Sequence, residues 1–118
     1  MPSLSQEQCV PCRGGEPVLD QFEIDELKPK VPEWHVLEEE GVQRLRRQFR
    51  FKDFQQALDF ANAVGAAAEE QDHHPVLVTE WGKVTVTWWT HAIGGLHRND
   101  FIMAARTDDL YRLSLIHI

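Results

Sequence analysis

Three histidines with acidic neighbours are the residues of this chain whose types and spacing best suit chemistry. His73 and His74 are adjacent and stand where a helical pattern stops, while His91 closes a strand pattern. Histidine is the side chain whose unperturbed pKa, about 6.5, lets it accept and release protons near neutral pH. Such a set predicts either proton-transfer chemistry or a metal site.

The spacing of these histidines favours proton transfer over metal binding, although histidines and carboxylates also ligate zinc. His73 and His74 diverge once the chain becomes extended, and the helical His-Glu-x-x-His pair of zinc enzymes is missing. Glu69 lies four residues before His73, so we expect its carboxylate to meet that imidazole on one helical face and fix its tautomer. His91 would supply a second acid or base, and we expect no metal and no cofactor.

A Cys-x-x-Cys pair, Cys9 and Cys12, is the other candidate for chemistry, because such a pair is half of a zinc site or a redox pair. It lies in a stretch with three prolines and two glycines, with no strand predicted before it and no helix after it. We therefore interpret residues 1–17 as a flexible leader whose deletion leaves activity and stability nearly unchanged. The alternative is that the two cysteines join across subunits to hold zinc or to form a disulfide.

The overall composition limits the partners of the chain. Its 118 residues fit a single domain, and its net charge is −7, with 19 acidic against 12 basic residues. A nucleic-acid surface needs clustered lysine and arginine, so this balance argues against one. No apolar run approaches the roughly 20 residues that span a bilayer, and the N-terminus carries no secretory signal pattern. We expect a cytoplasmic protein that contacts neither nucleic acid nor membrane.

Hydrophobic periodicity and turn residues predict the order helix, two strands, helix, two strands, helix. Sequential hairpins separated by helices favour an α+β domain, with a four-stranded antiparallel sheet and the helices packed on one face. We expect this domain to cover residues 18–118. The predicted spans are a short helix from 20, strands 34–38 and 43–51, a helix 53–72, strands 76–79 and 84–89, and a helix from about 97 to beyond 111.

The pattern around the histidines resembles that of the pterin-4a-carbinolamine dehydratases. The residues that carry the resemblance are Glu69, His73-His74-Pro75, Trp81, His91 and Asp100, with Trp34 and the run 49–54 similar to further family segments. The resemblance covers roughly residues 18–111. It implies four antiparallel strands with helices on one face, and dehydration of 4a-hydroxytetrahydropterin to the quinonoid dihydropterin in pterin recycling, without metal or organic cofactor.

The resemblance also implies a role for individual residues and an assembly of subunits. Carried over by position, the catalytic set is His73, His74 and His91. Asp72, Trp89 and Thr90 would border the pterin, Glu69 and Asp100 would be supporting carboxylates, and Trp34 would wall the pocket. We expect a homodimer or a homotetramer, because the edges of a four-stranded sheet need to be paired or covered.

Two classes of function stay open. The first is the dehydratase. The second is a non-catalytic pterin-binding or dimerisation-cofactor module on the same fold, or a role linked to molybdopterin metabolism. The intact set of three histidines favours the enzyme, because a pure binding role would not require it.

Overall fold

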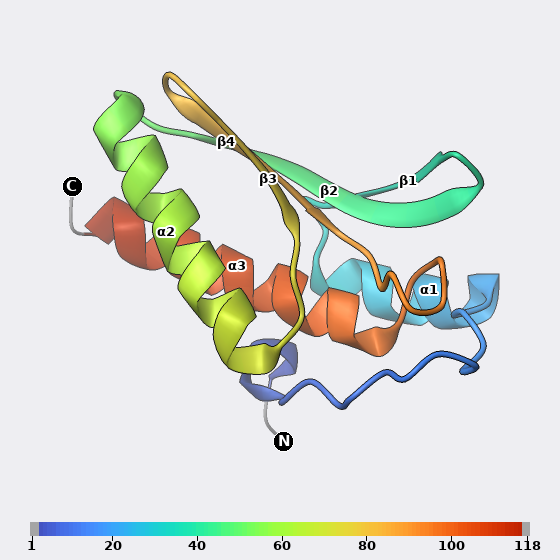
Figure 1. Cartoon of the computed structure of the whole chain (residues 1–118). Helices are drawn as coiled ribbons and strands as arrows, with labels where there is room; N and C mark the ends of the chain where they lie inside the picture. The colour runs from blue at the N-terminus through green and yellow to red at the C-terminus, as the bar shows by residue number, and fades with distance from the viewer. Residues whose placement is uncertain (1–2, 117–118) are drawn as a thin grey trace.

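Two hairpins and three helices follow one another in the predicted order (Figure 1). The computed structural model describes residues 3–116, so the first two residues of the expected leader and the last two of the expected domain lie outside this range. The elements are α1 (Gln21–Leu27), β1 (His35–Glu39), β2 (Val42–Arg50), α2 (Phe54–Gln71), β3 (Val76–Glu80), β4 (Lys83–Trp88) and α3 (Arg98–Ile116), with short 3-10 helices η1 (Leu4–Gln6) and η2 (Lys28–Lys30).

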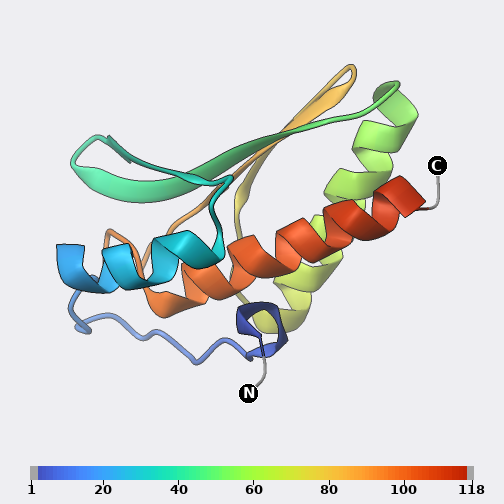
Figure 2. The ribbon, with the colours of Figure 1, turned by 180° about the vertical axis from the view of Figure 1, so that it is seen from behind.

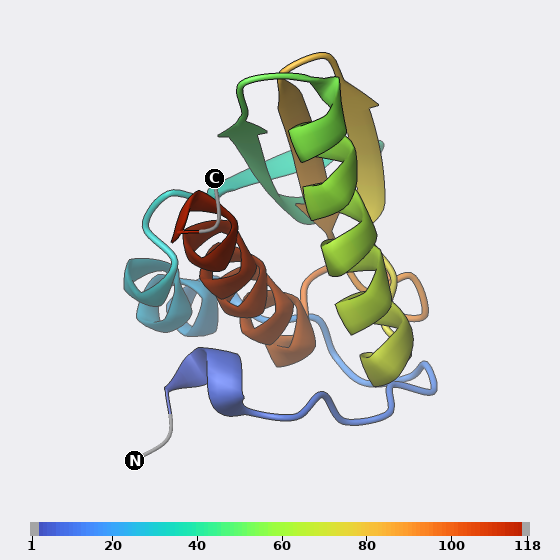
Figure 3. The same ribbon diagram turned by 90° about the vertical axis from the view of Figure 1, so that its left-hand side faces the viewer.

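The four strands form one sheet in the order β1-β2-β4-β3, and every neighbouring pair is antiparallel. The first hairpin turns through Glu40 and Gly41, whose φ angles of 54° and 76° are what a two-residue hairpin turn requires. All three helices lie on the same face of the sheet, with α3 between α1 and α2 (Figures 2 and 3). The expected α+β fold is therefore confirmed.

Side-chain caps begin α1 and α2. The Asp20 carboxylate accepts from the Glu23 backbone N–H at 2.9 Å, and the Glu23 carboxylate accepts from the Asp20 backbone N–H at 3.0 Å. This capping box is therefore complete. Asp53 likewise accepts from the Gln56 backbone at 2.8 Å, but the Gln56 side chain accepts from Lys52. The second capping box is thus only half formed, although it still satisfies one backbone donor at the start of α2.

Aromatic side chains fill the layer between the sheet and the helices. Phe49 of β2 packs against Phe60 of α2 and Tyr111 of α3, with ring centroids 4.8 and 4.9 Å apart. Trp34, just before β1, and Trp88, at the end of β4, are fully buried. Burying one large apolar side chain stabilises a fold by roughly 1.5–3 kcal/mol, so this packing holds the ends of α2, β4 and α3 in place.

The last helix, which we expect to run beyond residue 111, ends at Ile116. Its C-terminal apolar residues Leu113, Leu115 and Ile116 are exposed. Among residues 3–116, none of the helices combines the length and the apolar character that crossing a membrane demands.

A buried polar contact joins β1, β2 and α3. The Trp34 indole N–H donates to Asp108 Oδ1 at 2.8 Å, and the Arg47 guanidinium donates to the same oxygen at 2.6 Å. Asp108 is almost completely buried. A buried carboxylate is tolerated when donors satisfy it, so these two contacts explain how α3 can carry an acid on its inner face.

Asp108→Ala is expected to lower the free energy of unfolding by about 2–4 kcal/mol, because it leaves the Trp34 N–H and the Arg47 guanidinium without their acceptor. Urea denaturation followed by circular dichroism measures the change. Asp109→Ala is the matched control, since its partner is the exposed Arg112, and it should shift stability by less than about 0.5 kcal/mol. Equal losses in the two variants would contradict the structural role of Asp108.

Candidate active site

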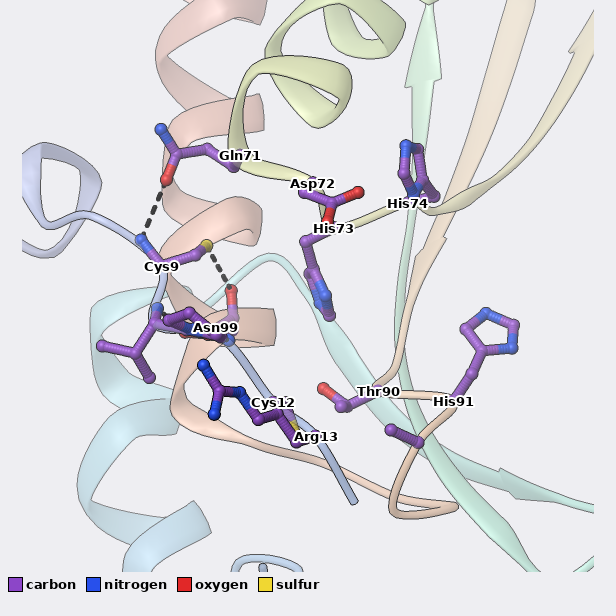
Figure 4. A pocket seen from close by; sticks show the side chains of 13 residues that line it. Cys9, Cys12, Arg13, Gln71, Asp72, His73, His74, Thr90, His91 and Asn99 are labelled. Atoms are coloured by element: carbon purple, nitrogen blue, oxygen red, sulfur yellow. Dashed lines mark hydrogen bonds between the residues drawn. The ribbon is translucent and has the colours of Figure 1, made fainter.

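A cavity of about 560 Å³ lies where the C-terminal end of α2, the loop after β4 and the start of α3 meet (Figure 4). Its lining consists of residues 71–74, 90–92, Asn99 and, from the leader, 9–13. Five expected site residues are therefore brought together: Asp72, His73, His74, Thr90 and His91. The volume falls in the range of about 300–1,000 Å³ that is typical of pockets for small organic ligands.

A left-handed residue ends α2 and turns the following histidines away from the helix. Asp72 has φ 51° and ψ 42°, and the backbone N–H of His73 donates back to the Ala68 carbonyl at 3.1 Å. Asp and Asn adopt this conformation more readily than other non-glycine residues. The chain then becomes extended toward β3, so His73 no longer lies on the helical face of α2.

The His73 imidazole is fixed by Asp100 and Trp88. Its Nε2 lies 2.6 Å from Asp100 Oδ1, and its ring stacks on the Trp88 indole with centroids 5.6 Å apart and planes 9° from parallel. Asp100 is fully buried, and its other oxygen accepts from the Thr90 hydroxyl at 2.8 Å and the His97 backbone N–H at 2.9 Å. With the carboxylate as acceptor, Nε2 carries a proton and Nδ1 is left to exchange one with a ligand.

The expected contact between Glu69 and His73 does not form. Glu69 lies instead 3.4 Å from Nε2 of His74, and both side chains are more than half exposed. The cause is the left-handed turn at Asp72, which removes His73 from the position four residues along the helix. An exposed pair of this kind contributes little to orientation, so Asp100 takes the role that the sequence assigned to Glu69.

His91 lines the same cavity from the loop after β4, and different side chains contact its imidazole. Its ring lies 4.3 Å from the Trp89 indole, and the Arg44 guanidinium lies 4.1 Å from that indole. Trp89 does not line the cavity itself. The two rings are tilted by 35°, so Trp89 supports this imidazole by aromatic packing, and Arg44 adds a cation–π contact to the indole.

Trp34 is not brought to the cavity. It is fully buried in the core, where its indole bonds Asp108 and packs edge-on against Phe49. The expectation that Trp34 walls this pocket is therefore wrong, because the residue points inward between β1 and α3. Sequence reasoning also missed Gln71, Asn99 and the leader as lining residues, because the contacts that join them span 62 and 89 positions of the chain and leave no local signal.

The two leader cysteines line the cavity without forming a reactive pair. Burial raises the pKa of the Cys9 thiol to about 11, and burial together with the hydrogen bond to Glu16 raises the pKa of Cys12. Their sulfur atoms have different partners: Cys9 contacts the Asn99 carbonyl and Cys12 donates to Glu16. The thiolate is the nucleophilic and metal-binding form, so both cysteines are chemically quiet at neutral pH. Within residues 3–116, no group of three or more histidine, cysteine or acidic side chains is arranged to hold a metal.

A family model described as "Pterin 4 alpha carbinolamine dehydratase" matches residues 17–110. The chain belongs to this family. It is 56% identical over 112 residues to a protein of Microcystis aeruginosa named "Putative pterin-4-alpha-carbinolamine dehydratase", with 95% of this chain and 97% of that protein covered. A protein of Chlorobium limicola with the same name is 59% identical over 111 residues, covering 94% of this chain and 98% of the other.

A solved structure gives the same relationship at lower identity. The crystal structure of a "transcriptional coactivator/pterin dehydratase" from Brucella melitensis has a TM-score of 0.73 and 30% identity, and covers 80% of this chain and 98% of that one. The resemblance drawn from the histidine pattern is therefore confirmed, and the family is one of hydro-lyases.

Asp100→Asn is expected to lower dehydratase turnover by about tenfold to a hundredfold, less than the loss of an acid–base group itself, because His73 would lose its ionised partner. Initial rates and thermal unfolding measure the effect. Glu69→Gln is the matched control: it alters only an exposed contact to His74 and should leave the rate nearly unchanged. If Glu69→Gln reduces turnover as much as Asp100→Asn, the assignment of Asp100 is wrong.

Proposed function

We propose that this cavity dehydrates 4a-hydroxytetrahydropterin to the quinonoid dihydropterin by histidine acid–base catalysis, as a step of pterin recycling that needs neither metal nor organic cofactor. The observation that carries the proposal is the placement of His73. Its imidazole is held by Asp100 and Trp88 at a cavity that it shares with His74 and His91. Membership of the dehydratase family supports the choice of substrate.

The reaction requires two proton transfers. The C4a–O bond breaks as the hydroxyl accepts a proton and leaves as water, and the electron pair of ring nitrogen N5 forms the C=N bond as N5 loses its proton. We assign proton delivery to His73, because Asp100 holds its Nε2 and leaves Nδ1 free to exchange a proton with a ligand, and proton removal to His91. His74 completes the set at the exposed rim of the cavity. Asp72 would border the ring at this rim, and the buried Thr90 would border it from inside the cavity.

A non-catalytic pterin-binding or dimerisation-cofactor role on this fold, or a role linked to molybdopterin metabolism, is the alternative. The Brucella melitensis protein is described as a transcriptional coactivator as well as a pterin dehydratase. Three imidazoles around one cavity favour catalysis, because binding alone needs no proton-transfer groups. A stopped-flow assay of carbinolamine dehydration separates the two classes, since a binding module would leave the spontaneous rate unchanged.

His73→Ala and His91→Ala are each expected to lower kcat, by up to the ~10²–10⁴-fold that general acid–base groups contribute, with a smaller observed loss because the substrate also dehydrates spontaneously. The stopped-flow assay measures the rate, and circular dichroism checks that the fold is retained. His35→Ala is the control, because His35 lies on β1 outside the cavity and is exposed. Near-wild-type rates in both cavity variants would refute the catalytic assignment.

We also propose that the protein assembles as a homodimer or homotetramer. β1 and β3 are the two edges of the sheet, and β3 with its turn exposes Val76, Val78 and Trp81. An exposed edge with apolar side chains is unfavourable unless another chain covers it. Light scattering at micromolar concentration should give a multiple of the 13.6 kDa chain mass, and a strict monomer would count decisively against assembly.

A further inference from the structure

The leader crosses the helices on the side away from the sheet and closes one side of the cavity (Figures 1 and 4). Its residues 9–13 line the same cavity as His73 and His91. Neither the histidine chemistry nor the fold of residues 18–116 accounts for this placement. The contacts that produce it are specific and lie at both ends of the segment.

Asn99 holds the leader with a pair of hydrogen bonds like those that neighbouring strands exchange. Its side-chain oxygen accepts from the Val10 N–H at 3.0 Å, and its side-chain nitrogen donates to the Val10 carbonyl at 2.7 Å. Asn99 is only 2% exposed, so water cannot replace these partners and their loss leaves a buried amide unsatisfied. Because Asn99 precedes Asp100, the leader is tied to the same turn that holds His73.

Three further side chains fasten the N-terminal part of the leader. Arg98 of α3 pairs with the Glu7 carboxylate through two hydrogen bonds of 2.9 and 2.8 Å. Gln71, at the end of α2, accepts from the Cys9 backbone N–H at 2.9 Å. Arg106 of α3 donates to the carbonyls of Ser5 and Glu7 at 3.2 and 2.6 Å. Arg106 does not line the cavity, so substituting it leaves the lining side chains themselves unchanged and releases its contacts with the leader.

The other end of the leader packs on the loop that carries His91. Gly14 has a φ of +89°, and a Cβ there would lie 3.4 Å from the Ala92 carbonyl. Val18 Cγ1 lies 2.5 Å from the place that a Cβ of Gly95 would occupy, so the absence of a side chain at Gly95 is what admits Val18. The leader is thus attached on both sides of the cavity opening.

We propose that residues 7–13 form a fixed wall of the catalytic pocket, and that Asn99 and Arg106 are positioning residues that hold this wall against the substrate. This is the opposite of the dispensable leader that the sequence suggested. The identity of the substrate rests on the proposed function, whereas the wall itself does not. Protonated thiols and the Val10 and Pro11 side chains exchange no protons at neutral pH, so the wall contributes to binding and water exclusion rather than to the chemical step.

Thiol labelling of the full-length protein tests whether the wall is fixed. Cys9 and Cys12 are the two cysteines of the chain, so reaction with N-ethylmaleimide at pH 8, resolved by peptide mass spectrometry, reports on this segment. We expect Cys9 to react about tenfold faster in Asn99→Ala and in Arg106→Ala than in the wild type, because release from burial restores thiolate. Asn62→Ala, an exposed asparagine on α2, is the control and should leave the rate unchanged.

Kinetics test whether the wall contacts the substrate. Asn99→Ala and Arg106→Ala are expected to raise KM about fivefold to tenfold, with kcat within about a factor of two, because they weaken binding without touching the histidines. Arg106→Ala acts at a distance from the cavity and keeps the test decisive if Asn99→Ala folds poorly. If Arg106→Ala labels faster at Cys9 but its KM is unchanged, releasing the leader does not affect substrate binding. That result would overturn the proposal.

The two proposals fail in different ways. If the wild-type protein shows no dehydratase turnover but Cys9 is protected and the variants release it, the proposed function is wrong and the wall stands. If turnover is intact but Cys9 reacts equally fast in wild type, Asn99→Ala and Asn62→Ala, the wall is wrong and the function stands.

Discussion

One buried carboxylate joins three segments that are distant in the chain. Asp100 belongs to the first turn of α3, and it accepts from His73 after α2, from Thr90 after β4, and from the His97 backbone at the start of its own helix. The free energy of burying a carboxylate without hydrogen-bond donors would exceed the net stability of a typical domain. These contacts therefore have to form together, and the relative positions of α2, β4 and α3 follow from that requirement. The arrangement of His73 at the cavity follows from satisfying this single acid.

The two principal imidazoles are held in contrasting ways. His73 is nearly buried and fixed by a charge-assisted hydrogen bond and a parallel indole. His91 is exposed and packs at a tilt against the Trp89 indole, with Arg44 over that indole. The Arg44 Nε is buried and has no hydrogen-bond partner among residues 3–116, so its cation–π contact offsets part of a desolvation cost. In the proposed mechanism, the exposed position of His91 would let its imidazole exchange a proton with water between turnovers.

Elements with strong local signals could be predicted from the sequence. The Asp20 cap, the apolar stripe of α2 and the two β-rich hairpins each reflect interactions within a few residues, and all are found near their expected bounds. Local spacing indicated the wrong partner for His73, Glu69, because one left-handed residue, Asp72, redirects the chain and spacing does not reveal a backbone conformation. The expectation for Trp34 was wrong for a related reason, because an indole suits a ligand pocket and a core equally well. Its place in the core depends on Asp108, 74 positions away.

The order in which this chain can assemble follows from where the leader is attached. Its N-terminal residues are synthesised first, yet Asn99 and Arg106 belong to the final helix, and the hydrogen bonds between them join residues 89 to 101 positions apart. Contacts of such separation close large loops and form late. The sheet and helices can therefore bury their core before the leader is in place. A segment that stays in solvent during folding is less prone to aggregation when it exposes little apolar surface. The proline, glycine and polar residues of positions 1–17 meet that condition. The active-site cavity is then the last part of the molecule to be completed.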